Sequence, residues 1–361
     1  MGQHPIRRHR VFGSLGPYNR DMAQLKPILI LGPTAGGKSD LAVGLAERLG
    51  GEVIGADAFQ VYRKLDAGTA KPDQTLRSRV PHHLIDVTEP TQRFTVHNWL
   101  ELATKAIGEI QSKGKRPIIV GGTNLYMKAL LDGMFEGPGQ DVDFRRSLDG
   151  LATPLLHMKL LEVDQASGER IKPMDRQRIV RALEVYELTG TPISELQTQW
   201  ENETEKGLDA ELIGLRWEAE HINPRINLRV KAMFYPDKVE PEIASAVCIN
   251  GESLIDEVKR LNQEGCFEPL DAQKGDASET PYAPNQAREA LGYKQLLAWM
   301  EGADDNITSL DEAFEKTKVL TRRFAKQQRT WLKRFTQTHW IDGQAEDVLD
   351  RALSWLPAVD H

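Results

Sequence analysis

The chain has 361 residues, 40% of them hydrophobic, only two cysteines and a formal net charge of −7. It contains no run of about 18 consecutive apolar residues, which excludes a membrane-spanning helix, and its cysteine count excludes a disulfide scaffold and a four-cysteine zinc site. The length is sufficient for two domains, and the few cysteines predict a cytoplasmic protein without membrane association.

The first 23 residues carry four arginines against one acidic residue and lack a hydrophobic run of signal-peptide length. We therefore predict that residues 1–23 form a mobile tail ahead of the folded chain. A translation start at Met22 and an organelle transit peptide are the alternatives for this segment.

The first predicted strand, "PILIL" at Pro27–Leu31, is followed by "GPTAGGKS" and by a helix over Lys38–Leu49. A glycine-rich loop between a strand and a helix lets backbone N–H groups converge on phosphate oxygens, and the helix N-terminus adds partial positive charge. Lys38 can neutralise the phosphate and Ser39 can bind Mg²⁺. The predicted phosphate-binding residues are Gly32, Pro33, Thr34, Ala35, Gly36, Gly37, Lys38 and Ser39.

A second strand, predicted at Glu52–Ala56, leads into "GADAFQVYRKLDAGTAKP" at Gly55–Pro72. The carboxyl ends of strands in an open parallel sheet line one crevice, so we expect Asp57 to face the same crevice as Lys38. There its carboxylate can accept a proton or hold a metal-bound water. The alternative is an aspartate that caps a helix or a turn.

A helix predicted at His97–Lys113 and a strand at Arg116–Val120 lead to "VGGTNLYMKAL". This is another strand that opens through two glycines into a helix at the crevice. Thr123 can donate a hydrogen bond to a substrate, or it can cap the helix that follows it. The alternation of strands and helices predicts an α/β fold of the P-loop NTPase type, a parallel sheet with flanking helices.

Later segments predict a second, helical part of the chain. "DRQRIVRALEVYELTG", Asp175–Gly190, has the pattern of an amphipathic helix that ends at its glycine, and "AELIGLRW" after Leu208 returns to a β-like pattern. The predicted divisions are 24–140 as the P-loop core, 141–208 as a mainly helical insertion domain, 209–345 as the remainder of the core and 346–361 as a C-terminal tail.

A basic segment lies near the end of the core. "KTKVLTRRFAKQQRTWLKR", Lys316–Arg334, carries eight basic residues and no acidic one, although the whole chain is acidic. Helical spacing puts Leu320, Phe324, Trp331 and Phe335 on one stripe, which predicts a buried face. The opposite face, free to meet an anion, carries Lys318, Arg322, Lys326, Arg329 and Lys333.

Seven motifs occur in the order found in one enzyme family: "GPTAGGKS", "DAFQVYRKLDAGTAKP", "PHHLID", "GGTNLY", "RALEVYELTG", "EALGYKQ" and "AKQQRTWLKRF". The chain resembles the tRNA dimethylallyltransferase (isopentenyltransferase) family, bacterial type, over roughly residues 26–340. The first motif is common to many phosphate-binding proteins, whereas its combination with "DAFQVYRKLDAGTAKP" and "GGTNLY" is specific. The resemblance implies that the loop holds the diphosphate of dimethylallyl diphosphate rather than a nucleoside triphosphate.

The resemblance also implies the reaction, which is transfer of the dimethylallyl group to N6 of the adenosine at position 37 of tRNA, beside the anticodon. The loop, Lys38 and a Mg²⁺ near Ser39 would stabilise the leaving diphosphate, together with Arg229. Asp57 would accept the N6 proton, and Thr123 would help to orient these groups.

By the family's pattern, the extruded base and the anticodon stem-loop are held by residues from five segments. These are Asp57, Ala58, Phe59 and Gln60; Arg145 with Gln177, Arg178, Ile179, Val180 and Arg181; Gly292, Tyr293, Lys294 and Gln295; and Arg322, Lys326, Arg329 and Lys333. Each has a structural alternative. Arg176, Arg178 and Arg181 can form a solvated helix face, and Tyr293 and Trp331 can be core aromatics.

The chain departs from the family in two extra segments, near 235–251 and 268–286, which we expect to be surface loops. It also lacks the C-terminal zinc module of eukaryotic members. Two other enzyme classes share the loop. A small-molecule kinase would normally show an arginine-bearing lid and a nucleotide-base pocket, neither of which is identifiable in the sequence. An adenylate isopentenyltransferase would not need the basic segment to hold RNA. A pure RNA-binding module would leave the loop unexplained. We expect a monomer whose partners are tRNA and dimethylallyl diphosphate.

Overall fold

The computed structural model describes residues 25–133, 137–197, 207–268 and 285–357. The predicted N-terminal tail and most of the segment 268–286 lie outside these residues. The described chain divides into two compact units, a smaller one within 130–208 and a larger one that contains the rest. Each unit is described by itself.

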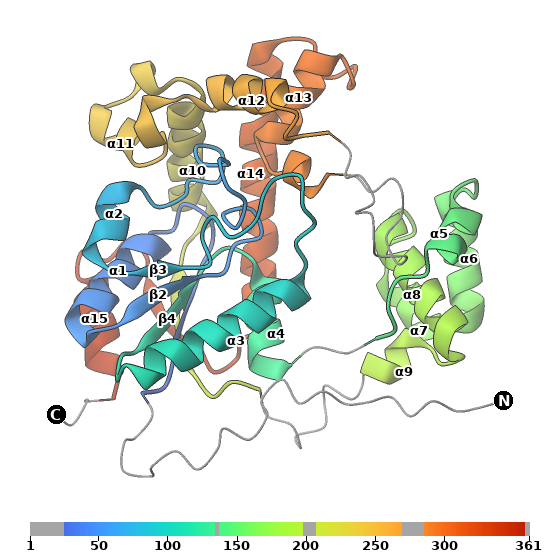
Figure 1. Ribbon diagram of the computed structural model, residues 1–361, viewed down its shortest axis with the longest axis horizontal. Helices are drawn as coiled ribbons and strands as arrows, with labels where there is room; N and C mark the ends of the chain where they lie inside the picture. Colours follow the sequence, from blue (N-terminus) through green and yellow to red (C-terminus); the bar gives the residue numbers. More distant parts are fainter. Residues whose placement is uncertain (1–24, 134–136, 198–206, 269–284, 358–361) are drawn as a thin grey trace. The chain divides into compact units, whose positions relative to one another are not determined.

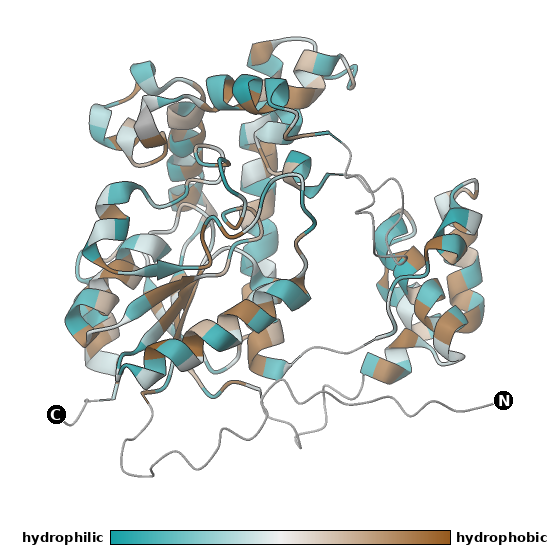
Figure 2. Ribbon diagram, in the orientation of Figure 1, coloured by the Kyte–Doolittle hydropathy of each residue, from teal (hydrophilic) through white to brown (hydrophobic). Residues whose placement is uncertain are grey.

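The larger unit is built on a six-stranded parallel sheet with the order β3-β2-β4-β1-β5-β6. Its strands are β1 Ile28–Leu31, β2 Glu52–Gly55, β3 His82–His83, β4 Pro117–Val120, β5 Glu211–Arg216 and β6 His339–Asp342. β1 lies near the centre, with Ile28 opposite Ile118 on one side and Glu211 on the other. Figure 2 shows these strands as largely hydrophobic, as expected for a sheet covered on both faces.

Helices cover both faces of this sheet. α1 (Lys38–Leu49) and α15 (Val348–Trp355) lie on one face, and α3 (Val96–Ser112) and the start of α4 (Asn124–Asp132) lie on the other (Figure 1). The remaining helices of the unit are α2 Gln74–Arg79, α10 Ala219–Phe234, α11 Pro241–Ser245, α12 Leu254–Gln263, α13 Tyr293–Glu301 and α14 Leu310–Leu332, with short 3₁₀ turns η2 Pro236–Lys238, η3 Ile249–Gly251 and η4 Gln286–Glu289. The predicted P-loop type of α/β fold is confirmed.

The smaller unit is helical, as the sequence predicted for this region. Its helices are α5 Val142–Leu148, α6 Thr153–Val163, α7 Gln165–Arg170, α8 Arg176–Thr189 and α9 Ile193–Gln197. Leu156, Leu160, Ile179 and Val185 are fully buried in its core. Glu184 is buried beside them and forms ion pairs with Arg145 and Arg181.

Two segments differ from their predictions. The predicted C-terminal tail contains α15, whose Leu349 packs against Gly44 of α1. The extra segment 235–251, expected as a surface loop, contains η2, α11 and η3 and buries Val247 and Cys248. Within the described residues, no helix has both the length and the apolar character that a membrane span needs.

The carboxyl ends of β2 and β4 are held against each other. Ala56 N donates to Val120 O at 2.8 Å, and Thr123 N donates to Ala56 O at 3.1 Å. Gly121 lies so close to Ala56 that a Cβ atom there would overlap the Ala56 carbonyl. The glycine therefore permits a backbone contact that sets Asp57 and Thr123 side by side.

We predict that Gly121→Ala destabilises the protein by about 1–3 kcal/mol or more, because the added methyl group must displace backbone rather than a flexible side chain. Urea unfolding followed by circular dichroism measures the change. The matched control is Gly108→Ala. Gly108 lies inside α3, and outside its own helical turn no atom lies within 4 Å of the new methyl group. This substitution should stabilise the protein slightly. Equal stability of the two variants would contradict the close contact.

Candidate active site

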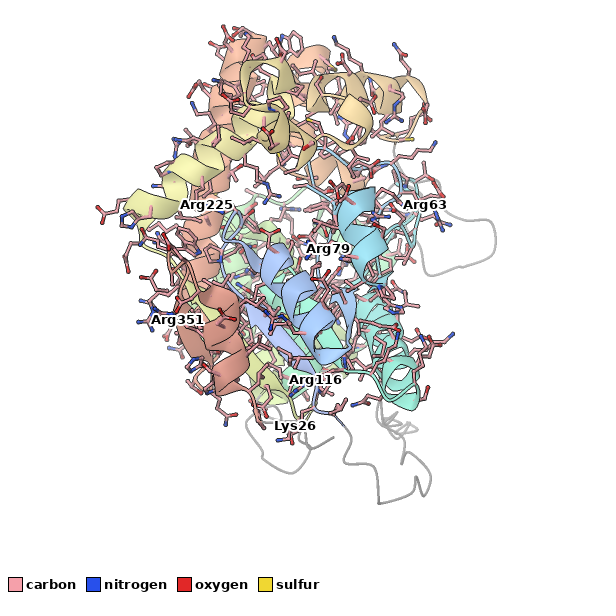
Figure 3. All side chains as sticks on the ribbon, turned by 90° about the vertical axis from the view of Figure 1, so that its left-hand side faces the viewer. Lys26, Arg63, Arg79, Arg116, Arg225 and Arg351 are labelled. Atoms are coloured by element: carbon pink, nitrogen blue, oxygen red, sulfur yellow. The ribbon has the colours of Figure 1, made fainter. Side chains whose placement is uncertain are left out.

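The loop after β1 turns its carbonyl groups outward onto neighbouring donors. Lys38 Nζ donates to Pro33 O at 2.7 Å and Trp217 Nε1 donates to Gly36 O at 3.1 Å. Arg225 of α10, labelled in Figure 3, donates its Nε to Ala35 O at 3.0 Å. With three carbonyls fixed on other partners, the loop is set in one conformation before any ligand binds.

Three amide groups at the end of the same loop are available to a ligand. Gly37 is the N-cap of α1 with φ 82°, a left-handed conformation that glycine adopts readily. Within the described part of the chain, the amides of Gly37, Lys38 and Ser39 have no hydrogen-bond acceptor. Free amides at a helix N-terminus attract anions. The geometry is that of the predicted phosphate site.

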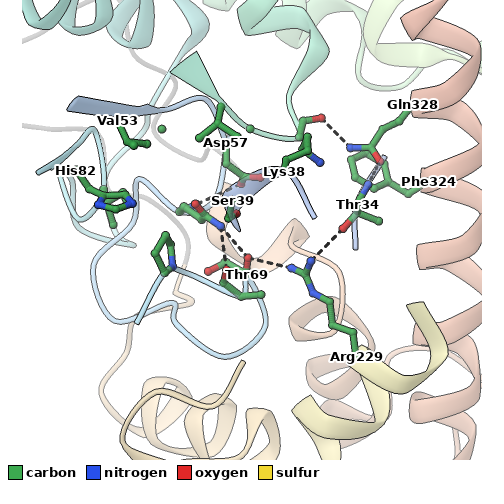
Figure 4. A pocket seen from close by; sticks show the side chains of 18 residues that line it. Thr34, Lys38, Ser39, Val53, Asp57, Thr69, His82, Arg229, Phe324 and Gln328 are labelled. Atoms are coloured by element: carbon green, nitrogen blue, oxygen red, sulfur yellow. Dashed lines mark hydrogen bonds between the residues drawn. The ribbon is translucent and has the colours of Figure 1, made fainter. Parts of the chain in front are cut away.

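Two cations lie beside these amides in one pocket (Figure 4). The Lys38 side chain is buried, and its burial, together with the nearby Arg229 charge, lowers the pKa of Lys38 to about 7, although Asp57 acts in the opposite direction. Arg229 reaches from α10 and donates to Thr34 Oγ1 and to Thr69 O, both at 3.5 Å. The two positive groups are held at a cost in solvation, which a bound anion would offset.

Asp57 lines the same pocket and uses its two oxygens differently. Oδ1 accepts hydrogen bonds from Phe59 N at 2.9 Å and Gln60 N at 3.3 Å, so the turn-capping alternative is correct for this atom. Oδ2 lies beside Gly122, where an added Cβ would stand 3.3 Å from it. Among the described residues Oδ2 has no hydrogen-bond partner, which leaves it available to a substrate proton.

Thr123 orients the segment that carries Asp57. Its Oγ1 accepts a hydrogen bond from Ala58 N at 2.9 Å, across the junction between the ends of β2 and β4. Thr123 precedes α4, but its hydroxyl is directed to this neighbouring loop rather than to the amides of α4. This contact supports an orienting role for Thr123, which stays a prediction.

The loop at residues 66–71 forms another wall of the pocket and is anchored from behind. Gln60 Nε2 donates to Thr69 O at 3.1 Å and to Ala70 O at 3.2 Å. On the other side of the loop, Ala67 N donates to Glu257 of α12 at 2.8 Å. Burial raises the pKa of Glu257 to about 7, although the Ala67 amide and the Tyr293 hydroxyl oppose the shift.

The residues at 292–295, predicted to approach RNA, belong to this anchor. Tyr293 is fully buried, donates its hydroxyl proton to Glu257, and accepts a hydrogen bond from Gly68 N at 3.3 Å. Gln295 is buried and accepts from Gly292 N at 2.8 Å, whereas Lys294 is exposed and paired with Glu289. The core alternative for Tyr293 is therefore correct, and the approach of the segment Gly292–Gln295 to RNA stays a prediction.

The basic helix α14 is rotated relative to its predicted orientation. Apart from Leu332, its buried positions are small or polar, namely Ala313, Thr317, Ala325 and Gln328. Phe324, predicted to be buried, is 39% exposed and lines the pocket. Small side chains let α14 approach α10 and the glycine loops closely, and this contact decides which face is buried.

The predicted basic face of α14 is accordingly divided. Arg322 is directed inward to Asn227 Oδ1, and Arg329 donates to Trp217 O at 3.2 Å. The side chains of Lys326 and Lys333 are exposed, and neither forms an ion pair within the described residues. Lys318 is paired with Glu315, so within the described residues Lys326 and Lys333 are the two of the five predicted positions that remain open to a phosphate.

In the helical unit, the predicted RNA-binding residues likewise fall into two groups. Arg145 and Arg181 are paired with Glu184, and the Ile179 side chain is buried in the core of the unit. The approach of these residues to RNA stays a prediction. Gln177 and Arg178 are exposed at the start of α8, with Val180 partly buried. The solvated-face alternative is correct for Arg178 as the chain stands alone.

Sequence reasoning missed four residues that shape the site: Trp217, Arg225, Thr69 and Gln328. The first two hold loop carbonyls, and Thr69 supplies a carbonyl to Arg229. Gln328 lies within the basic segment, but the predicted helix orientation gave it no role. In the structure it is buried and bonded to both glycine loops.

Known proteins share both the sequence and the fold. The family model described as IPP transferase matches residues 60–335. A tRNA dimethylallyltransferase of Geobacter sulfurreducens is 40% identical over 329 residues, which span 90% of this chain and 94% of the relative. The solved structure of the full-length tRNA isopentenylpyrophosphate transferase from Bacillus halodurans has a TM-score of 0.60 and 32% identity, covering 91% of this chain and 95% of that chain. With a match across most of its length, the chain belongs to the IPP transferase family.

Proposed function

We propose that the chain transfers a dimethylallyl group from dimethylallyl diphosphate to N6 of the adenosine at position 37 of tRNA, yielding N6-isopentenyladenosine and diphosphate. The observation that carries the proposal is a single pocket in which an anion site, made by Lys38, Arg229 and free loop amides, adjoins an unpartnered carboxylate oxygen of Asp57. The names of the relatives, tRNA dimethylallyltransferase, support the same reaction.

In this reaction the C–O bond between the allylic carbon and diphosphate breaks, and the diphosphate leaves with the electron pair. The N6 amine forms the new C–N bond and loses a proton, which Asp57 Oδ2 accepts. Negative charge develops on the diphosphate, where Lys38, Arg229 and the loop amides are already placed. Because an exocyclic amine is a weak nucleophile, close placement of the two substrates contributes more than the base.

We also propose that Mg²⁺ accompanies the diphosphate. Ser39 follows Lys38 at the start of α1 and lines the pocket, so its hydroxyl can bind a cation that is shared with diphosphate oxygens. No group of three or more His, Cys, Asp or Glu side chains in the described chain can hold a metal. This donor set fits Mg²⁺, which binds few protein groups when substrate phosphates and water supply the rest.

For the tRNA, we propose contacts from Lys326 and Lys333 of α14, from Gln177 and Arg178 of α8, and from the segment Asp57–Gln60. A monomer in the cytoplasm remains our proposal. The names of the relatives do not favour the kinase or the adenylate isopentenyltransferase, and α14 supplies exposed lysines that neither alternative needs.

The test is incubation of the purified protein with tRNA and dimethylallyl diphosphate, followed by mass spectrometry of the tRNA nucleosides. N6-isopentenyladenosine is the expected product. A parallel reaction replaces tRNA with AMP, and another replaces dimethylallyl diphosphate with ATP. Product from AMP alone would support the adenylate enzyme, and ATP consumption would support the kinase.

We predict that Asp57→Asn lowers kcat by about 10²-fold or more, because the variant keeps a turn-capping oxygen but loses the proton acceptor. Single-turnover product formation measures the rate, and filter binding should show tRNA affinity near that of the parent. The control is Asp237→Asn, an exposed aspartate outside the pocket. An Asp57→Asn variant that turns over like the parent would remove Asp57 from proton transfer.

The lowered pKa of Lys38 predicts a pH dependence of diphosphate binding. Since this pKa is about 7, the fraction of protonated Lys38 in the free protein falls as the pH rises above 7. An anion binds the protonated form of Lys38. The Kd for inorganic diphosphate should therefore increase by up to about tenfold per pH unit between pH 7 and 9.

The matched control for this pH dependence is Lys38→Arg, whose guanidinium stays charged over that range. Isothermal titration calorimetry of both proteins at several pH values gives the comparison. Diphosphate also titrates in this pH range, but this affects the Kd of the parent and of the variant equally, so it cancels in the comparison. Identical slopes for the parent and the arginine variant would mean that Lys38 remains protonated throughout, contrary to the prediction.

Lys326 and Lys333 provide a test of the RNA-facing side of α14. Replacing both with Gln should make the slope of log K against log[salt] for tRNA binding shallower by about 1.4–1.8, at about 0.7–0.9 per phosphate contact. A charge-matched control replaces the exposed Lys105 and Lys259, which lie on α3 and α12. If the two double variants give the same slope, α14 makes no phosphate contact through these lysines.

A further inference from the structure

Gln328 is a buried amide that joins the two glycine-rich loops of the site. It lies on α14 and is 3% exposed. Its Oε1 accepts a hydrogen bond from Thr34 N at 2.8 Å, and its Nε2 donates to Gly122 O at 2.9 Å. One side chain thus contacts the loop after β1 and the loop after β4, as Figure 4 shows.

Each of these contacts lies next to a reacting group of the proposed function. Thr34 is in the anion-binding loop, and its hydroxyl is within 3.5 Å of Arg229. Gly122 precedes Thr123, and a Cβ at Gly122 would stand 3.1 Å from Gln328 Nε2 and 3.3 Å from Asp57 Oδ2. The amide of Gln328 therefore spans the interval between the leaving-group side and the proton-acceptor side of the pocket.

We propose that Gln328 is a positioning residue that fixes the separation between the diphosphate-binding loop and Asp57. This proposal rests on the proposed function. Thr34 N and Gly122 O require one acceptor and one donor from the same side chain, and an amide supplies both. The effect on rate follows from geometry, because a displacement of about 1 Å between reacting groups can lower a rate by about 10²-fold.

Two substitutions separate positioning from simple packing. Gln328→Met keeps the approximate length and loses both hydrogen bonds, so we expect kcat to fall by about 10–100-fold, with little change in the KM for tRNA. Gln328→Glu keeps an acceptor for Thr34 N, and it can donate to Gly122 O only when protonated. Its kcat relative to the parent should therefore rise as the pH is lowered from 8 to 6, whereas the ratio for Gln328→Met stays flat.

The matched controls are Gln327→Met and Gln327→Glu, on the neighbouring exposed position of the same helix. They should keep the parent's kcat at every pH. Circular dichroism and urea midpoints establish which variants are folded. A folded Gln328→Met with the parent's kcat overturns the proposal, and so does a Gln328→Glu variant whose relative kcat does not change with pH. If Gln328→Met does not fold, the pH profile of Gln328→Glu decides.

A second readout distinguishes this proposal from the proposed function. The Kd for inorganic diphosphate is measured by calorimetry without tRNA. It should increase several-fold in Gln328→Met, because Thr34 N–H then lacks its partner. It should not change in Gln327→Met. If the parent forms no isopentenyladenosine, the proposed function fails, and this binding comparison still decides whether Gln328 organises the loop. Equal diphosphate affinity in both variants overturns that role.

Discussion

The site depends on the backbone contact between Gly121 and Ala56, where the ends of β2 and β4 meet without room for a Cβ atom. Hydrogen bonds from Ala56 N to Val120 O and from Thr123 N to Ala56 O close this junction. Asp57 follows one strand and Thr123 the other, so the contact sets these two side chains beside each other. In an open parallel sheet the ligand binds at such strand ends, and this junction places Asp57 and Thr123 at that edge.

Around the junction, loops without regular structure are held by buried polar side chains from distant helices. Gln328 of α14 reaches both glycine loops, and Glu257 of α12 accepts amide protons from the loop at residues 66–71. A buried amide or carboxylate is costly unless all its hydrogen-bonding capacity is used, so each of these side chains favours one loop conformation over others. The late part of the chain, although far from the phosphate loop in sequence, thus determines the rigidity of the pocket.

The parts of the site predicted correctly from the sequence are those in which local chemistry dictates position. A loop with the pattern of Gly32–Ser39 between a strand and a helix has few conformations, and Asp57 follows a strand whose end must line the crevice. Which face of α14 is buried was not predictable in this way. A hydrophobic stripe through Phe324 suggested one buried face, but Ala325 and Gln328 are buried instead, because close approach to backbone favours small residues and polar backbone groups need partners. The helix α15 and the anchoring role of Tyr293 also arise from tertiary contacts that no local pattern encodes.

The electrostatics of the pocket favour a highly charged anion over a neutral ligand. Lys38 and Arg229 stand close enough that each charge disfavours the other, and burial lowers the pKa of both, while Asp57 is the carboxylate that acts in the opposite direction. A buried lysine and a partly buried arginine, with one carboxylate in the same pocket, leave an excess of positive charge, and the free amides of Gly37, Lys38 and Ser39 add to it. A diphosphate would satisfy all of these groups at once, and its charge increases as the allylic bond breaks. The stabilising groups are fixed before the reaction by Pro33, Trp217 and Arg225 contacts, so the rising charge meets dipoles that do not have to reorient.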